Sequence, residues 1–391
     1  MWIGFLLVHL HGILGPKRTA LKTTRFHSVK SLLLGVFIVL FTASSFASVT
    51  KDSKESKDDK EFNASELIFH HIGDSHSFHV YGSNEDHFPK ALTINLPIIL
   101  WTDNGLVTFS SGEFHHDVDG KAVVEKKGLK FVNLHDKIYQ LNEGESAVAF
   151  DEEHHAENAK RPLDFSITKN VFSMFLSVAL LFLIFIAAAR SYRKSSNNMP
   201  SGIGSLMEPI VVFVRDEVAI PNIGNKHHAR FMPFLLTLFF FIWINNVIGL
   251  VPFFPFSSNL SGNIAFTLTL AVITFLITIF NSKKYYWKHM LWMPGLPVPM
   301  KLFLAPIEII GMFVKPIALM VRLFANITAG HVIVLSLISL IFIFKSIYIA
   351  PISVAFTLFI SVIEVLVVAI QAYIFTMLSA MYFGQALEEE H

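Results

Sequence analysis

The sequence predicts a mostly α-helical membrane protein with about five transmembrane helices, a long tilted helical hairpin at the C-terminal end, and a small β-rich extracytoplasmic N-terminal domain. Three observations support this prediction. The chain of 391 residues is 53% hydrophobic and only 16% charged, its apolar runs exceed what a soluble helix needs, and acidic residues gather before those runs. The absence of cysteine excludes disulfides and thiolate metal sites, and nothing resembles a nucleic-acid footprint.

Residues 1–47 are predicted to be a signal peptide with an extended n-region. Lys22, Arg25 and Lys30 precede the apolar run SLLLGVFIVLFTASSFA, which ends in small residues at the positions that a signal peptidase requires. Cleavage is expected after Ala47. The alternative is a retained membrane helix, but the run is short and the charged linker KDSKESKDDKE follows it immediately.

Residues 48–168 are predicted to form an acidic extracytoplasmic domain, because they hold 12 Lys or Arg against 22 Asp or Glu. Short alternating segments between turn residues indicate β-structure. The best strand candidates are Leu92–Leu100, Leu106–Ser110 and Leu129–Val132.

This domain also holds ten of the chain's 18 histidines: His70, His71, His76, His79, His87, His115, His116, His135, His154 and His155. Histidine pairs such as His76 with His79 are able to bind zinc or copper. The spacing is not fixed, however, and a solvated acidic face that carries histidines is the favoured interpretation. We therefore predict no metal and no cofactor.

Residues 169–391 are predicted to be the membrane domain. The first span, Val171–Ala189, ends in ARSYRK, so its C-terminal end is expected to face the cytoplasm. The stretch MEPIVVFVRDEV then predicts an interfacial helix. Phe231–Val251 crosses outward, and Ile264–Phe280 returns to a loop with four lysines and no acid: Lys283, Lys284, Lys288 and Lys301.

Two longer apolar segments, residues 302–344 and 351–386, complete the chain. As a continuous helix the first would be about 64 Å long, roughly twice the ~30 Å thickness of the hydrocarbon core. It must therefore tilt, bend or break, and the available break points are Pro306, Gly311, Pro316 and Gly330.

Polar residues follow one face of the first long segment. Glu308, Lys315 and Arg322 are spaced by seven, and Asn326 lies one turn beyond Arg322. An arginine at the centre of a bilayer costs at least ~2.5–3.5 kcal/mol, so a functional reason is expected.

A hairpin that turns near residues 345–350 brings together residues whose position numbers sum to about 695. Arg322 with Gln371 and His331 with Glu364 meet this condition. The alternative is that each pair only satisfies its partner in a packed bundle. Five aligned polar residues favour a functional site over that alternative.

The motifs RLFANITAG, KPIALMVRLF, IWINNVIGLVP and VAIQAYIFTMLSAMYFG resemble subunit a of F-type ATP synthases, over about residues 163–391. The resemblance implies a bacterial inner-membrane protein that lies against the ring of c subunits, with subunit b and other Fo stator components as further partners. It also implies two offset proton half-channels in the lipid bilayer. No GxxxxGK[ST] phosphate loop is present, so the chain is not expected to be an enzyme on its own.

The resemblance also implies residue roles. Arg322 matches the essential arginine that faces the c-subunit carboxylate, and Gln371 and Asn326 match residues lining the same region. Glu308 matches an acidic residue of the cytoplasmic half-channel, although it could also be a plain interfacial glutamate. Asn246 matches a polar residue on the extracytoplasmic entry route.

This sequence departs from the family pattern at His331 and Glu364. Familiar bacterial members have glutamate and histidine, respectively, at these two positions, so the pair is exchanged. An exchange within one level of the hairpin keeps one imidazole and one carboxylate together, as a proton relay needs. Gly249 is a second departure, since some relatives carry an acid there.

Two other classes remain as alternatives. An independent cation/proton antiporter would also need buried charges, but the chain shows no internal repeat and no paired broken helices. A structural anchor for the exported domain gives no reason for Arg322. Protons are favoured over sodium only by the family and by the His331–Glu364 pair, because the ion-binding carboxylate belongs to subunit c.

Overall fold

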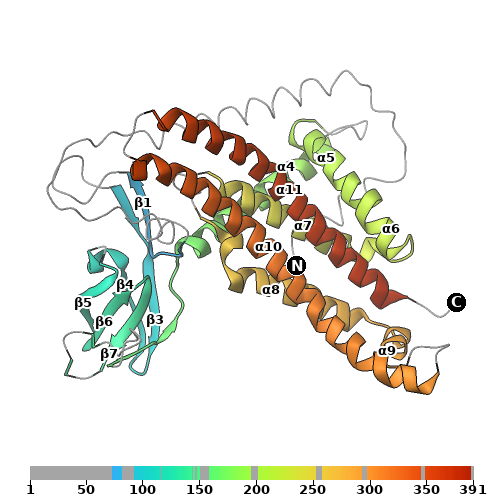
Figure 1. The fold of residues 1–391 in the computed structure, drawn as a ribbon, viewed down its shortest axis with the longest axis horizontal. Helices are drawn as coiled ribbons and strands as arrows, with labels where there is room; N and C mark the ends of the chain where they lie inside the picture. Colours follow the sequence, from blue (N-terminus) through green and yellow to red (C-terminus); the bar gives the residue numbers. More distant parts are fainter. Residues whose placement is uncertain are drawn as a thin grey trace. The chain divides into compact units, whose positions relative to one another are not determined.

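The computed structural model describes residues 73–81, 92–115, 117–142, 144–145, 148–149, 158–194, 201–251, 258–292, 297–344 and 348–388 (Figure 1). The predicted signal peptide lies outside these residues. The chain divides into two compact units. A β-rich unit spans Ser65–Phe175 with Pro252–Ser258, and a helical unit includes Leu176–Val251 and Asn259–His391.

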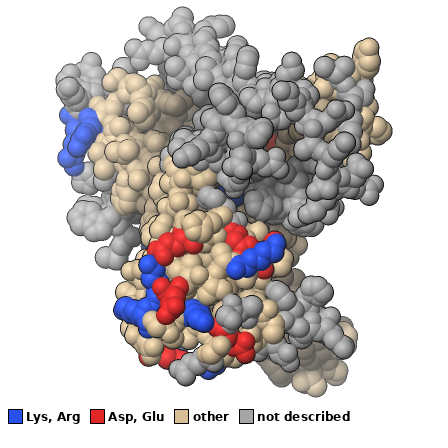
Figure 2. Space-filling view, turned by 90° about the vertical axis from the view of Figure 1, so that its left-hand side faces the viewer, with Lys and Arg blue, Asp and Glu red and all other residues tan. Residues whose placement is uncertain are grey.

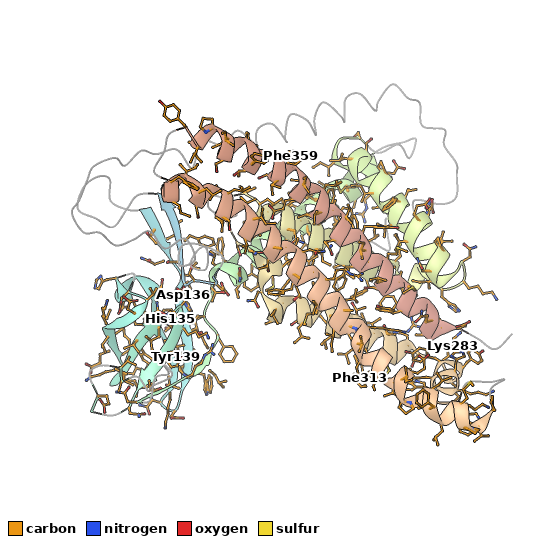
Figure 3. All side chains as sticks on the ribbon, in the orientation of Figure 1. His135, Asp136, Tyr139, Lys283, Phe313 and Phe359 are labelled. Atoms are coloured by element: carbon orange, nitrogen blue, oxygen red, sulfur yellow. The ribbon has the colours of Figure 1, made fainter. Side chains whose placement is uncertain are left out.

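The β-rich unit contains antiparallel sheets. Its described strands are β1 (Ser77–Tyr81), β2 (Leu92–Asn95), β3 (Pro97–Thr102), β4 (Gly105–Ser110), β5 (Asp119–Lys126), β6 (Leu129–Leu134), β7 (Lys137–Leu141), β8 (Ala159–Lys160) and β9 (Leu163–Asp164). They pair in the orders β1–β2, β4–β3–β9 and β5–β6–β7–β8. Strands β6 and β7 are joined by a two-residue turn, His135–Asp136, whose positive φ values of 49° and 62° suit a tight hairpin (Figure 3).

The predicted strand Leu92–Leu100 is wrong in one respect, because the structure divides it between two sheets. The division falls at Leu96, whose N–H donates to the His76 carbonyl at 3.0 Å and to Ser111 Oγ at 3.1 Å. Before Leu96 the chain pairs with β1 and after it with β4, so β2 and β3 belong to different sheets. The other two predicted strands correspond to β4 and β6.

A separate apolar core holds the larger sheets of this unit together. Its buried members come from β3 to β7 and the short 3-10 helix between β4 and β5: Ile98, Leu100, Val107, Phe109, Phe114, Val124, Phe131 and Ile138. Phe109 contacts the rings of both Phe114 and Phe131, at centroid distances of 5.7 and 5.6 Å.

The rest of the described chain is helical. Its helices are α4 (Lys169–Lys194), α5 (Ile203–Phe213), the π-helix η3 (Val214–Ala219), α6 (Ile220–Ile223), α7 (His228–Gly249), α8 (Ile264–Asn281), α9 (Lys284–Leu291), α10 (Val298–Phe344) and α11 (Ala350–Leu387). Five of them, α4, α7, α8, α10 and α11, are long and apolar enough to cross a membrane. The prediction of about five such helices is confirmed, whereas the predicted interfacial helix is divided between α5 and η3.

Helix α10 is unbroken, although it contains Pro306 and Pro316. Its 47 residues correspond to about 70 Å of helix. Of the three outcomes predicted for this segment, breaking is therefore excluded. Helix α11 runs beside α10 and also packs against α7 (Figure 1).

Candidate functional site

The α10–α11 pair is aligned by contacts at three levels. Nearest the connection, Ser353 Oγ donates to the Leu337 carbonyl. Next, His331 Nε2 lies 3.9 Å from Glu364 Oε1. Farther along, Lys315 Nζ donates to Gln385 Oε1 at 3.0 Å. The position numbers of these pairs sum to 690, 695 and 700, close to the value predicted from the sequence.

Glu364 is buried, with 5% of its surface exposed, and its Oε1 atom has no hydrogen-bond partner within the described part of the chain. At 3.9 Å from His331 Nε2 it is within ion-pair distance but too far for a direct hydrogen bond. A small movement of either side chain, or one water between them, would connect the two groups. The described chain therefore brings one imidazole and one buried carboxylate close together without a direct hydrogen bond between them.

Gly330 makes room for this carboxylate, and sequence reasoning did not assign it that role. A Cβ atom at position 330 would lie 2.7 Å from Glu364 Oε1, which is closer than real contacts allow. The signal was available in the sequence, since Gly330 directly precedes His331 and shares the level of Glu364 in the hairpin.

Arg322 lies near the midpoint of α10 and is exposed. It forms no ion pair with a carboxylate among the residues that the structure describes, and it interacts electrostatically with Tyr382. Gln371, its predicted partner, is buried on α11. The two residues lie between the His331 and Lys315 levels, but no hydrogen bond joins these two described side chains. Asn326 is exposed on α10, one turn beyond Arg322.

Glu308 and Lys315 have different surroundings, although the sequence places them on one face with Arg322. Lys315 turns toward α11, where it lies 5.5 Å from the ring of Tyr382 as well as bonding Gln385. Glu308 is exposed and close to α9. Burial, and then the Glu308 carboxylate, raise the pKa of Tyr286 on α9.

Asn246 lies near the C-terminal end of α7 and is buried, with 4% of its surface exposed. Its amide nitrogen has no hydrogen-bond partner in the described chain, whereas the neighbouring Asn245 donates to the Phe241 carbonyl at 2.7 Å. An unpaired buried amide is costly, so the Asn246 nitrogen is available to donate to a water. Gly249 is the last residue of α7.

The histidines of the β-rich unit do not form a metal centre in the part that is described, where no three potential metal-binding side chains come together. His76 is buried, and its Nε2 lies 3.8 Å from Asp164 Oδ2. Burial raises the pKa of Asp164, but the nearby His76 imidazole and a hydrogen bond from the Ser166 N–H outweigh burial and lower the pKa below its usual range. The side chain of His79 lies outside the described residues.

Five apolar helices with amide and ionisable side chains inside them define a multi-pass membrane protein. The family model described as ATP synthase A chain matches residues 171–384. A second model, a domain of unknown function (DUF8433), matches residues 67–165. The chain belongs to the ATP synthase A chain family.

Curated relatives agree with this assignment. An ATP synthase subunit a of Chloroherpeton thalassium is 47% identical over 231 residues, covering 58% of this chain and 68% of the relative. An ATP synthase subunit a 2 of Prosthecochloris aestuarii is 39% identical over 315 residues, covering 78% and 94%. The second of these alignments is long enough to extend beyond the membrane helices.

Proposed function

We propose that this chain is the proton-translocating stator subunit of an F-type ATP synthase. In this role it provides two offset half-channels that load and unload protons on the carboxylates of the c-ring, and Arg322 separates them. Proton flow is thereby coupled to rotation and ATP synthesis. The observation that carries the proposal is an exposed guanidinium at the middle of a long apolar helix, without a carboxylate partner in the described chain.

The cost of a membrane arginine explains why a partner is needed. An isolated charge at the bilayer centre is unfavourable, and arginine does not deprotonate to escape the cost. A rotor carboxylate that passes Arg322 supplies the opposite charge and is itself kept ionised by the arginine. A fixed positive charge also repels a proton that would otherwise run directly between the half-channels. Gln371 and Asn326 provide hydrogen-bonding groups on either side of this position.

The remaining polar residues divide between the two half-channels. On the extracytoplasmic side, Asn246 and the His331–Glu364 pair receive the proton, and the pair passes it between imidazole and carboxylate. On the cytoplasmic side, the exposed Glu308 accepts the released proton. The chain contributes no nucleotide site, so it is a component of the ATP synthase complex rather than a catalyst alone.

The proposed topology follows from the basic residues. Arg190, Arg193 and Lys194 at the end of α4 would face the cytoplasm, as would the lysines around α9. In the bacterial inner membrane, residues 1–47 would then direct residues 48–168 out of the cytoplasm, residues 169–391 would form the membrane domain, and the C-terminus would be cytoplasmic. Because the chain has no cysteine, single introduced cysteines would report each side through an impermeant maleimide.

Substitution of Arg322 tests the central role. In inverted vesicles that contain the complete synthase, Arg322→Ala should abolish ATP-driven proton pumping while the subunit still assembles with the c-ring. Ala325→Ser, an equally exposed change one turn away, should pump normally. Unimpaired coupling in Arg322→Ala would falsify the proposal, and would reopen the alternative of an independent cation/proton antiporter, which family membership does not favour.

The relay is tested by restoring the common family arrangement. His331→Glu alone places two carboxylates at one level and should impair pumping, and adding Glu364→His should recover part of it. If the single change is harmless, the pair is not a relay. If pumping is lost in both the single and the double variant, the two exchanged positions are not equivalent in the relay.

A further inference from the structure

The sheet β4–β3–β9 carries large apolar side chains on both faces, although Thr108 and Ser110 of β4 also lie on the second face. On β3, Ile98 and Leu100 point into the core and are fully buried. Ile99 and Trp101 alternate with them and therefore lie on the opposite face. An antiparallel sheet with one face in water normally alternates apolar and polar residues. The second face of this sheet is therefore expected to contact another apolar surface rather than water.

Apolar residues adjoin one another across all three strands of that second face. Trp101 pairs with Leu106 on β4 and with Leu163 on β9. Phe165 follows two residues later, and its N–H donates to the Ile99 carbonyl at 2.8 Å. The exposed fractions of Trp101, Leu106, Leu163 and Phe165 are 56%, 46%, 66% and 62%. These four residues and Ile99 are called the apolar sheet face.

The chain connects this face directly to a membrane-spanning helix. Phe165 lies four residues before Lys169, the first residue of α4, so even a fully extended connection is at most ~14 Å long. The apolar sequence of α4 begins at Val171. The apolar sheet face is therefore within reach of the bilayer surface.

The β-rich unit also holds the first turn of α4 in a fixed position. Asn170 N–H donates to Asp74 Oδ1 at 3.0 Å, and this aspartate caps the helix. The ring of Phe172 packs edge-on against Phe78, with centroids 5.4 Å apart. These contacts join the first turn of α4 to the β-rich unit.

The composition of the apolar sheet face suits a lipid surface. Tryptophan and phenylalanine are favoured at membrane interfaces, and basic residues beside them contact lipid phosphates. Lys160 and Arg161, both exposed, lie two to three residues before the start of β9. Elsewhere on the unit, Lys and Arg alternate with Asp and Glu on the face turned to the viewer in Figure 2, as expected of a surface in water.

We propose that the apolar sheet face rests on the extracytoplasmic surface of the bilayer, with its side chains among the lipid headgroups and upper acyl chains. In this proposal the β-rich unit binds the bilayer surface and thereby sets where α4 enters the membrane. This proposal rests on α4 spanning the bilayer in the orientation proposed above, and it does not depend on the proton pathway.

Site-directed spin labelling of the full chain in vesicles of phosphatidylcholine and phosphatidylglycerol tests the proposal. Because the chain has no cysteine, Leu106→Cys and Leu163→Cys each give one labelled site. Val123→Cys, an exposed apolar site on the four-stranded sheet, is the matched control. Collisions with oxygen, which concentrates in lipid, and with a water-soluble nickel chelate are measured at each site.

Labels at Leu106 and Leu163 should lose their collisions with nickel and gain collisions with oxygen, relative to the label at Val123. If nickel reaches them as it reaches Val123, the apolar sheet face lies in water and the proposal is overturned. Protection from both reagents overturns it too, because a second copy or another protein then covers the face. Neither outcome would alter the expected loss of pumping in Arg322→Ala.

Discussion

Helices α7 and α10 are both apolar enough to cross a membrane, but they have opposite surroundings. In the most apolar window of α7, 61% of the residues are buried by the chain itself, against 11% in α10. Each helix carries a polar residue, the buried Asn246 on α7 and the exposed Arg322 on α10. Hydropathy thus predicts that a helix crosses the membrane, whereas burial indicates whether its neighbours belong to its own chain.

The contacts of the two helices explain the difference. Aromatic rings surround α7, where Phe240 packs against Phe185 at 5.1 Å and Phe231 stacks on Phe383 at 4.9 Å. Side chains on α10 and α11 such as Phe313 and Phe359 are more than half exposed (Figure 3). The helical unit is therefore organised around α7, and the open side of α10 is available to lipid or to a partner subunit.

The largest expected effect is a loss of stability, and it should differ between the two helices when the same substitution, Phe→Ala, is made in each. Phe240→Ala should lower the free energy of unfolding by about 3 kcal/mol, at the low end for a buried phenylalanine, because lost packing rather than transfer from water dominates in a bilayer. Phe303→Ala on α10, where the ring is 73% exposed, should change it by less than about 0.5 kcal/mol. Unfolding of the purified subunit in mixed micelles by dodecyl sulfate measures both. Equal losses of unfolding free energy in the two variants would mean that the difference in burial does not affect stability.

The second prediction concerns the packing of α6 on α11. A Cβ atom at Gly384 would lie 1.9 Å from the Asn222 carbonyl oxygen, so the backbone of α6 must move. Gly384→Ala should cost about 1–3 kcal/mol in the same unfolding assay. Gly311→Ala on α10, where nothing lies within 4 Å, should instead stabilise the helix by about 0.5–1 kcal/mol. A neutral Gly384→Ala would show that α6 is only loosely held.

The third prediction affects transport more than stability. Gly330→Ala brings a methyl group against the flexible end of Glu364, which rotates away from His331, so the unfolding free energy should fall by less than about 1 kcal/mol. ATP-driven proton pumping should nevertheless fall several-fold, because the carboxylate no longer faces the imidazole. Gly311→Ala is again the matched control and should pump normally. Full pumping in Gly330→Ala would show that the close contact between Gly330 and Glu364 is not needed for proton transfer.

The smallest expected effect is a pH dependence beside the α7 core. Burial raises the pKa of Glu208 on α5 above its usual 4.5, so its stabilising contribution is complete below pH 4.5 and is lost as the pH rises through the folded-state pKa. Glu208→Gln should therefore raise the unfolding midpoint at pH 8 and leave it nearly unchanged at pH 4. Glu217→Gln, at an exposed position on η3, is the control for the chemical change itself. If Glu208→Gln changes the unfolding midpoint equally at pH 4 and pH 8, burial of Glu208 does not make stability depend on pH.

Sequence reasoning predicted the number of membrane-crossing helices and the pairing of His331 with Glu364, because length, hydropathy and helical rise are regular quantities. It did not predict that α10 continues through Pro306 and Pro316, since a proline removes one backbone bond and neighbouring structure can absorb the loss. The division of Leu92–Leu100 was also missed. It depends on Leu96 bonding to His76 and Ser111, two residues that are distant in sequence.

The candidate site shows the same limit. The residue pairs of the hairpin follow from one arithmetic rule, but whether a side chain turns toward α11 does not. Lys315 turns inward to Gln385 and Arg322 remains exposed, although a spacing of seven gives them the same face. Side-chain length and the local partner decide this, and no single-chain pattern contains that information.

The π-helix η3 between α5 and α6 behaves as an extra residue retained within an otherwise regular helix. It rotates everything after it by about 100° relative to a continuous α-helix. In this register Val218 and Ala219 face the interior. The Asn222 carbonyl lies against Gly384 of α11, where any side chain would collide with it. Removing one of the three charged residues of η3 would leave the apolar residues unchanged, yet it would rotate α6 away from its contact with α11.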